Sequence, residues 1–124
     1  MHALVVDDSD VIRKILTAYL QKLGFQVTST VNGREALDQL HRMEKADVAL
    51  VDWNMPEMDG ITCLRKLRAM ALEPRPAVVM CTTESGMPKI CEALEAGADE
   101  YIMKPYDRNV LLDKLEQLGL TERV

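Results

Sequence analysis

Short apolar runs alternate with amphipathic helical patterns along the chain, and this alternation constrains the fold more than any other feature of the sequence. Apolar runs of this length between helical patterns are typical of buried strands in a parallel sheet. The predicted strands are Ala3–Val6, Gln26–Thr30, Val48–Val51, Ala77–Cys81 and Glu100–Met103. The predicted helices follow Ser9, span roughly Gly33–Met43, follow Gly60, begin at Pro88 and span Arg108–Leu118. Five such units predict an α/β domain with right-handed crossovers and helices on both faces of the sheet.

Four of the five predicted strands end in residues suited to phosphate or Mg²⁺ chemistry. These residues are Asp7 and Asp8, Asp52, Thr82 and Thr83, and Lys104 followed by Pro105. Open parallel sheets bind their ligands just beyond the carboxyl ends of the strands. Three carboxylates, a hydroxyl and an ammonium group are therefore expected to converge on one crevice.

The three carboxylates need a cation between them, because like charges brought together repel each other. A few hard oxygen ligands without histidine suit Mg²⁺, which commonly bridges carboxylates to a phosphate. We therefore predict Asp7, Asp8 and Asp52 as metal ligands. Asp52 can also act as a nucleophile that forms an acyl phosphate, with Lys104 and Thr82 contacting the phosphoryl group. Taken singly, these residues also fit ordinary roles as helix caps, turn hydroxyls or solvated charges.

Length and charge exclude several classes of protein. The chain has 124 residues, of which 48% are hydrophobic, so we predict a single domain over residues 1–124 with no output domain. The formal net charge of -5 argues against nucleic-acid binding, which depends on clustered basic residues. We interpret the basic pair Arg13-Lys14 as part of a solvated helix face.

The cysteines and the first residues bear on the cellular compartment. Cys63, Cys81 and Cys91 are odd in number and lack the spacing of a zinc or redox site, so they are predicted to be reduced packing residues of a cytoplasmic protein. The sequence moves from Met1 straight into a strand pattern without a basic leader or a long apolar stretch. No membrane association is therefore expected.

Six short motifs in a fixed order give the whole chain a resemblance to one family. They are Val5-Val6-Asp7-Asp8-Ser9, Leu50-Val51-Asp52-Trp53-Asn54-Met55-Pro56, Met58-Asp59-Gly60, Met80-Cys81-Thr82-Thr83-Glu84, Gly97-Ala98-Asp99 and Tyr101-Ile102-Met103-Lys104-Pro105. Each motif is weak alone, but together they resemble the receiver domain of two-component response regulators, and most of all its stand-alone chemotaxis members. The resemblance implies a flavodoxin-like fold with five parallel strands in the order 2-1-3-4-5.

The same resemblance implies a role for each site residue. Asp52 would be the phosphoacceptor of a phosphorelay, with Lys104 and Thr82 assisting. Asp8 would bind Mg²⁺ directly and Asp7 through water, and the backbone carbonyl of Asn54 would complete the protein ligands. Thr82 and Tyr101 would form a switch pair, in which the hydroxyl moves toward the phosphoryl group and the aromatic ring turns inward.

Partners and reaction rates follow from the resemblance as well. A histidine kinase would supply the phosphoryl group, and a protein target, in chemotaxis the flagellar motor, would bind the face formed by the fourth helix, the fifth strand and the fifth helix. A monomer is the default for stand-alone receivers. Asn54 and Glu84 occupy positions where the family tunes dephosphorylation. Thr83 departs from the small alanine that is frequent in the family, so we expect an altered phosphorylation rate.

Three other functions remain open at the level of sequence. An aspartate-dependent phosphohydrolase would commonly carry a second acid two residues after its nucleophile, where this chain has Asn54. A phosphate sink would accept phosphoryl groups without binding any target. A flavin-binding domain of the same fold would need a Ser/Thr/Gly-rich loop after the first strand, which this sequence lacks.

Overall fold

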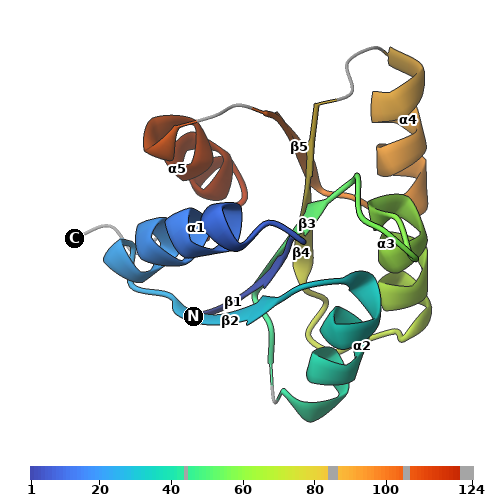
Figure 1. Cartoon of the computed structure of the whole chain (residues 1–124), viewed down its shortest axis with the longest axis horizontal. Helices are drawn as coiled ribbons and strands as arrows, with labels where there is room; N and C mark the ends of the chain where they lie inside the picture. The colour runs from blue at the N-terminus through green and yellow to red at the C-terminus, as the bar shows by residue number, and fades with distance from the viewer. Residues whose placement is uncertain (44, 84–86, 105–106, 121–124) are drawn as a thin grey trace.

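The computed structural model describes residues 1–43, 45–83, 87–104 and 107–120, in which five strands and five helices alternate (Figure 1). The strands are β1 (His2–Val6), β2 (Gln26–Thr30), β3 (Val48–Asp52), β4 (Ala77–Thr82) and β5 (Glu100–Met103). The helices are α1 (Asp10–Lys22), α2 (Gly33–Arg42), α3 (Gly60–Ala69), α4 (Met87–Ala96) and α5 (Arg108–Gln117). The predicted alternation is confirmed, and the boundaries differ by one or two residues, as at α4, which begins one residue before Pro88.

The strands form one parallel sheet in the order β2-β1-β3-β4-β5, which confirms the flavodoxin-like fold. Helices α1 and α5 cover one face of the sheet, and α2, α3 and α4 cover the other (Figure 1). Right-handed crossovers place α1 on the face opposite to α2, α3 and α4, because β2 is added on one side of β1 whereas β3, β4 and β5 are added on the other. The strand order reverses at β1 and β3, so the carboxyl ends of these two strands flank the crevice where such sheets bind ligands.

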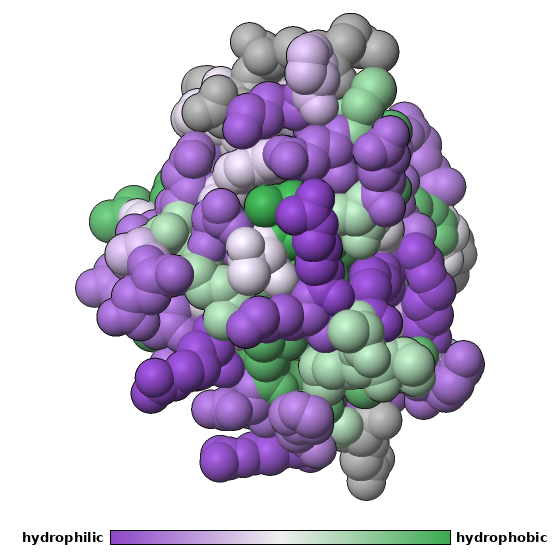
Figure 2. Space-filling view, turned by 90° about the vertical axis from the view of Figure 1, so that its right-hand side faces the viewer, coloured by the Kyte–Doolittle hydropathy of each residue, from purple (hydrophilic) through white to green (hydrophobic). Residues whose placement is uncertain are grey.

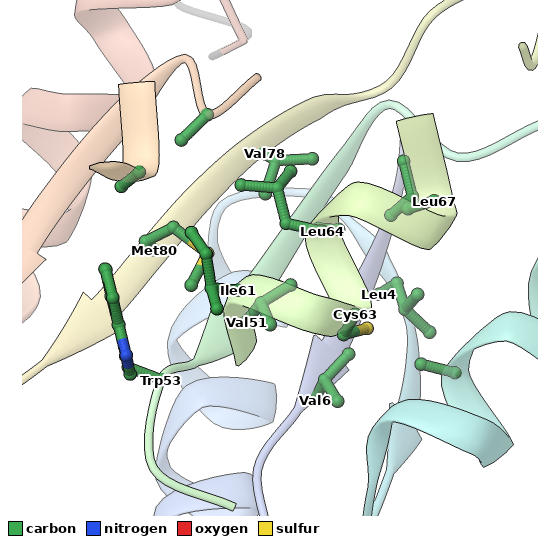
Figure 3. Close-up of a cluster of buried hydrophobic side chains, with 14 of the residues drawn as sticks. Leu4, Val6, Val51, Trp53, Ile61, Cys63, Leu64, Leu67, Val78 and Met80 are labelled. Atoms are coloured by element: carbon green, nitrogen blue, oxygen red, sulfur yellow. The ribbon is translucent and has the colours of Figure 1, made fainter. Parts of the chain in front are cut away.

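Two hydrophobic clusters, one on each face, hold the helices to the sheet. Leu16 and Leu20 of α1 and Leu111 and Leu115 of α5 pack on one face. On the other face, α3 places its apolar side chains over β1, β3 and β4 (Figure 3). The outer surface over α2, α3 and α4 is largely hydrophilic with small apolar patches between the polar side chains (Figure 2). Within the described ranges, no helix has both the length and the apolar character needed to cross a membrane.

Four helices begin at a side chain that caps the first turn. Their capping residues Ser9, Asn32, Asp59 and Asp107 each accept a hydrogen bond from the backbone N–H of the third residue of α1, α2, α3 and α5, respectively. These caps satisfy donors that have no partner inside the helix. The caps of α1 and α3 follow β1 and β3, the two strands whose carboxyl ends flank the crevice.

Candidate functional site

The carboxyl ends of β1 and β3 bring three carboxylates together. Val6 pairs with Val51 in the sheet, so Asp7 and Asp52 lie side by side at this edge. One carboxylate oxygen each from Asp7, Asp8 and Asp52 lies within 4.8 Å of the others. Asp7 and Asp52 are buried and Asp8 is exposed, so the cluster opens to solvent on the side of Asp8.

Hydrogen bonds between neighbouring strand ends hold this cluster in place. The Asp7 backbone N–H donates to the Thr30 carbonyl (3.2 Å), and the Trp53 N–H donates to the Cys81 carbonyl (2.9 Å). The Lys104 N–H donates to the Thr82 carbonyl (2.8 Å). Each bond continues the pairing of neighbouring strands by one residue. The backbones of Asp7, Trp53 and Lys104 are therefore held by the sheet.

Lys104, which follows β5, contacts two of the three carboxylates. Its Nζ donates to Asp52 Oδ1 at 2.9 Å and to Asp7 Oδ2 at 3.2 Å. Burial would lower the pKa of Lys104, but its hydrogen bond to Asp52 and the charges of Asp52 and Asp7 outweigh burial and raise that pKa. Burial and the neighbouring Asp7 raise the pKa of Asp52 against the opposing effect of Lys104. An additional cation beside Asp52 would therefore stabilise its ionised carboxylate.

The other predicted site residues lie around this cluster with different degrees of exposure. Thr82 is the fully buried last residue of β4, whereas Thr83 after it is exposed. Asn54 is exposed, and its backbone N–H lies 3.4 Å from Asp52 Oδ1. Tyr101 lies half-buried on β5, where its hydroxyl donates to Met103 Sδ at 2.8 Å. Glu84 and Pro105 lie outside the described residues, as does the Lys104–Pro105 bond.

Arg13 also contacts the site, but it was not identified from the sequence. Its interpretation as part of a solvated helix face is wrong. Its side chain is only 13% exposed, whereas Lys14 beside it is exposed. Arg13 Nη1 donates to the backbone carbonyl of Asp7 at 2.7 Å, and Nη2 pairs with Asp10. The one sequence signal was its position within α1, one turn after Ser9, because helical side chains point back toward the start of their helix.

Gly60 permits α3 to begin close to the carboxyl end of β3. Its N–H donates to the Trp53 carbonyl at 2.8 Å. A Cβ at this position would lie 2.7 Å from Trp53 Cα and still closer to the Asp52 backbone oxygen. Trp53 itself is buried against Met80 and Ile61 at the start of α3 (Figure 3). Trp53, the residue directly after β3, therefore lies in close contact with the start of α3.

Replacing Gly60 with alanine is expected to lower the free energy of unfolding by about 1–3 kcal/mol, because the added methyl group overpacks this contact. It should also weaken Mg²⁺ binding, since the displaced backbone carries Asp52. Gly24→Ala is a matched control: Gly24 has φ of 93° and no atom within contact range, so its loss costs stability far from the crevice. Chemical denaturation and calorimetric Mg²⁺ titration measure both effects. Equal Mg²⁺ affinities in the two variants would show that Gly60 does not set the position of Asp52.

The donor set fits Mg²⁺ on the geometry of this chain. Three carboxylates within 4.8 Å of one another supply hard oxygen ligands, two from buried residues and one from an exposed residue. Mg²⁺ prefers such ligands and retains several waters, for which the open side at Asp8 leaves room. Among the described residues this is the only group of three acidic, histidine or cysteine side chains that could hold a metal.

Comparisons with known proteins agree with this arrangement. Residues 3–116 match the response regulator receiver domain family. A chemotaxis protein CheY homolog of Campylobacter jejuni is 41% identical over 119 residues, which cover 95% of this chain and 92% of that protein. The crystal structure of the chemotaxis protein CheY4 of Vibrio cholerae superposes with a TM-score of 0.88 at 33% identity, covering 94% of this chain and 96% of that chain.

A third relative bears on the metal. The receiver domain of a sensor histidine kinase from Pseudomonas aeruginosa, solved with a magnesium ion coordinated in its active-site cleft, has a TM-score of 0.83 at 28% identity and covers 94% of each chain. Family match, sequence identity and fold all point the same way. The chain belongs to the response regulator receiver domain family and is CheY-like in sequence and structure.

Proposed function

We propose that this chain is a CheY-like response regulator that accepts a phosphoryl group from a histidine kinase on Asp52 and thereby changes its affinity for a protein target. The observation that carries the proposal is the contact of one half-buried lysine, Lys104, with two carboxylates of a three-carboxylate cluster. Such a cluster can bind a divalent cation and a phosphoryl group together, because the lysine and the cation neutralise the transferred oxygens from two sides.

The residues divide the transfer between them. An oxygen of Asp52 forms the new bond to phosphorus, while the bond from phosphorus to the donor's histidine nitrogen breaks and the leaving imidazole takes up a proton. Lys104 turns from the Asp52 carboxylate to the phosphoryl oxygens, and Thr82 donates a hydrogen bond to them. Asp8, Asp52 and the Asn54 carbonyl would hold Mg²⁺ directly and Asp7 through water. The bound ion supplies charge neutralisation at the phosphoryl group.

The output is proposed to be binding rather than turnover. Thr82 moves toward the new phosphoryl group and Tyr101 turns into the space it leaves, which shifts a two-state equilibrium. The target would bind the face of α4, β5 and α5, on which Leu94, Met103 and Val110 are exposed. The chemotaxis relatives make a flagellar motor component a candidate target. We further propose that the chain acts as a monomer in the cytoplasm.

A phosphate sink is the second candidate, and a binding experiment separates it from a regulator. Immobilised wild-type chain, phosphorylated with acetyl phosphate and Mg²⁺, is compared with the Asp52→Asn variant for capture of proteins from the native cell. A regulator retains a partner that depends on phosphorylation, whereas a sink retains the same proteins in both forms. A phosphohydrolase is less favoured because Asn54 offers an amide where such enzymes use an acid.

Mg²⁺ is expected to raise the melting temperature at neutral pH, since a ligand that binds only the native state stabilises it. The effect should fade as the pH falls. The folded-state pKa of Asp52 is raised, so its protonated form stabilises the fold, and that contribution is lost as the pH rises through the raised value. Above that value Asp52 is ionised and gains most from the cation, and below it protons compete with Mg²⁺. Scanning calorimetry across this pH range tests the assignment, and a melting temperature indifferent to Mg²⁺ at every pH would contradict it.

A further inference from the structure

Arg13 contacts the one peptide bond that joins the two neighbouring aspartates. Its Nη1 donates to the Asp7 carbonyl oxygen at 2.7 Å, and this oxygen belongs to the peptide plane between Asp7 and Asp8. The peptide unit is planar, so a fixed carbonyl also fixes the direction in which the chain enters Asp8. Asp10, which is 79% exposed, pairs with Nη2 and orients the guanidinium from the solvent side.

Asp7 is held at each of its polar atoms. Its N–H donates to the Thr30 carbonyl, its Oδ1 accepts from the Ser9 N–H at 2.9 Å and its Oδ2 accepts from Lys104. Arg13 supplies the remaining contact, at the carbonyl. The Asp7 backbone is therefore restrained on both sides of its Cα, and Arg13 supplies the restraint on the side that leads to Asp8.

Asp8 has no such restraint of its own. Its side chain is exposed, and over the described part of the chain it makes no hydrogen bond or ion pair with protein atoms. Its carboxylate nevertheless lies within 4.8 Å of a ligand atom of Asp7 and of Asp52. The position of this carboxylate depends on the backbone that carries it, and so on the peptide that Arg13 contacts.

We propose that Arg13 is a positioning residue for the metal site: it fixes the Asp7–Asp8 peptide so that Asp8 is held toward Asp52 before the cation binds. This inference rests on the proposed function, because it concerns the same Mg²⁺ site. Arg13 is positively charged, and its charge alone would weaken the binding of Mg²⁺ to a site this close. The sign of the effect therefore separates positioning from electrostatics.

Arg13→Met is expected to weaken Mg²⁺ binding about tenfold, the lower end of the loss that follows removal of a group orienting a metal ligand. Lys14→Met is the matched control, because it removes a positive charge from the adjacent, exposed residue. Electrostatics alone predicts that both variants bind Mg²⁺ more tightly. We expect Lys14→Met to bind within about twofold of wild type, since exposed charges are screened. Calorimetric titration with MgCl₂ at fixed ionic strength gives the three dissociation constants.

Melting temperatures in EDTA separate positioning from general damage to the fold. A merely structural role would lower the melting temperature of Arg13→Met without changing its Mg²⁺ dissociation constant. If Arg13→Met does not fold, Arg13→Gln replaces it, since the amide nitrogen falls short of the Asp7 carbonyl; it should also bind Mg²⁺ more weakly than Lys14→Met. Arg13 variants that bind Mg²⁺ as tightly as Lys14→Met would overturn the inference alone. A wild-type chain that binds no Mg²⁺ would overturn the proposed function and the inference with it.

Discussion

Replacing Asp52 with asparagine is expected to abolish labelling by acetyl phosphate and Mg²⁺ while leaving the chain folded. The asparagine oxygen belongs to a neutral amide and cannot form the acyl phosphate. The variant should be at least as stable as wild type at neutral pH in EDTA. The raised pKa of Asp52 means that its ionised form is disfavoured in the folded state, and asparagine is never ionised. Intact-mass spectrometry measures the labelling, and thermal unfolding measures the stability.

Asp38→Asn is the matched control, because Asp38 is an exposed aspartate on α2, away from the crevice. Its labelling should equal that of wild type, at one phosphoryl group per chain. Labelling of Asp52→Asn to one equivalent would mean that another carboxylate accepts the phosphoryl group. Peptide mapping of the labelled wild-type chain would then identify the residue.

Lys104→Met is expected to slow labelling by about a hundredfold, the usual loss when one preorganised donor to developing charge is removed. It should also lower the free energy of unfolding by about 3 kcal/mol at neutral pH in EDTA. Across the described residues Lys104 is the only basic side chain within ion-pair distance of Asp7 or Asp52, so its loss leaves two buried carboxylates without a counterion. The stability difference should shrink as the pH falls through the raised pKa of Asp52, because protonation of Asp52 removes one of the two unpaired charges.

Lys66→Met provides the comparison for this variant, because Lys66 is an exposed lysine on α3 and forms no salt bridge with any described residue. It should label at the wild-type rate and unfold within about 0.5 kcal/mol of wild type. A Lys104→Met chain that labels as fast as Lys66→Met would show that Lys104 takes no part in transfer. Acetyl phosphate time courses under identical Mg²⁺ concentrations make this comparison direct.

The sequence predicted the fold because its local signals agree with one another. Buried parallel strands read as uninterrupted apolar runs, and helix starts such as Ser9 carry their own capping side chain. Convergence of the strand ends followed from the geometry of parallel sheets, which brings Asp7, Asp52 and Lys104 to one edge. The strand order did not follow from local patterns, because no residue encodes which strand lies beside it; it came from the resemblance to the family.

Arg13 shows where local patterns lose their information. Its neighbour Lys14 has the same charge and nearly the same place on α1, yet only Arg13 is turned toward the end of β1. The difference depends on the angle at which α1 leaves the sheet, which is a tertiary property. Similarly, Val11 and Ile15 belong to the apolar pattern of α1 but are exposed, while Leu16 and Leu20 carry the packing. The roles of Tyr101, Thr83 and Glu84 came from the resemblance to the family and stay predictions.

The central claim is that carboxylates from β1 and β3 share one divalent cation, and a crystal soaked in Mn²⁺ tests it most directly. Mn²⁺ takes the same oxygen ligands as Mg²⁺ and gives an anomalous signal. We predict one strong anomalous peak between the Asp8 and Asp52 carboxylates, about 2.0–2.1 Å from one carboxylate oxygen of each residue or slightly farther. A fully soaked crystal without a peak there, or with a peak that touches only one of the two carboxylates, would contradict the account.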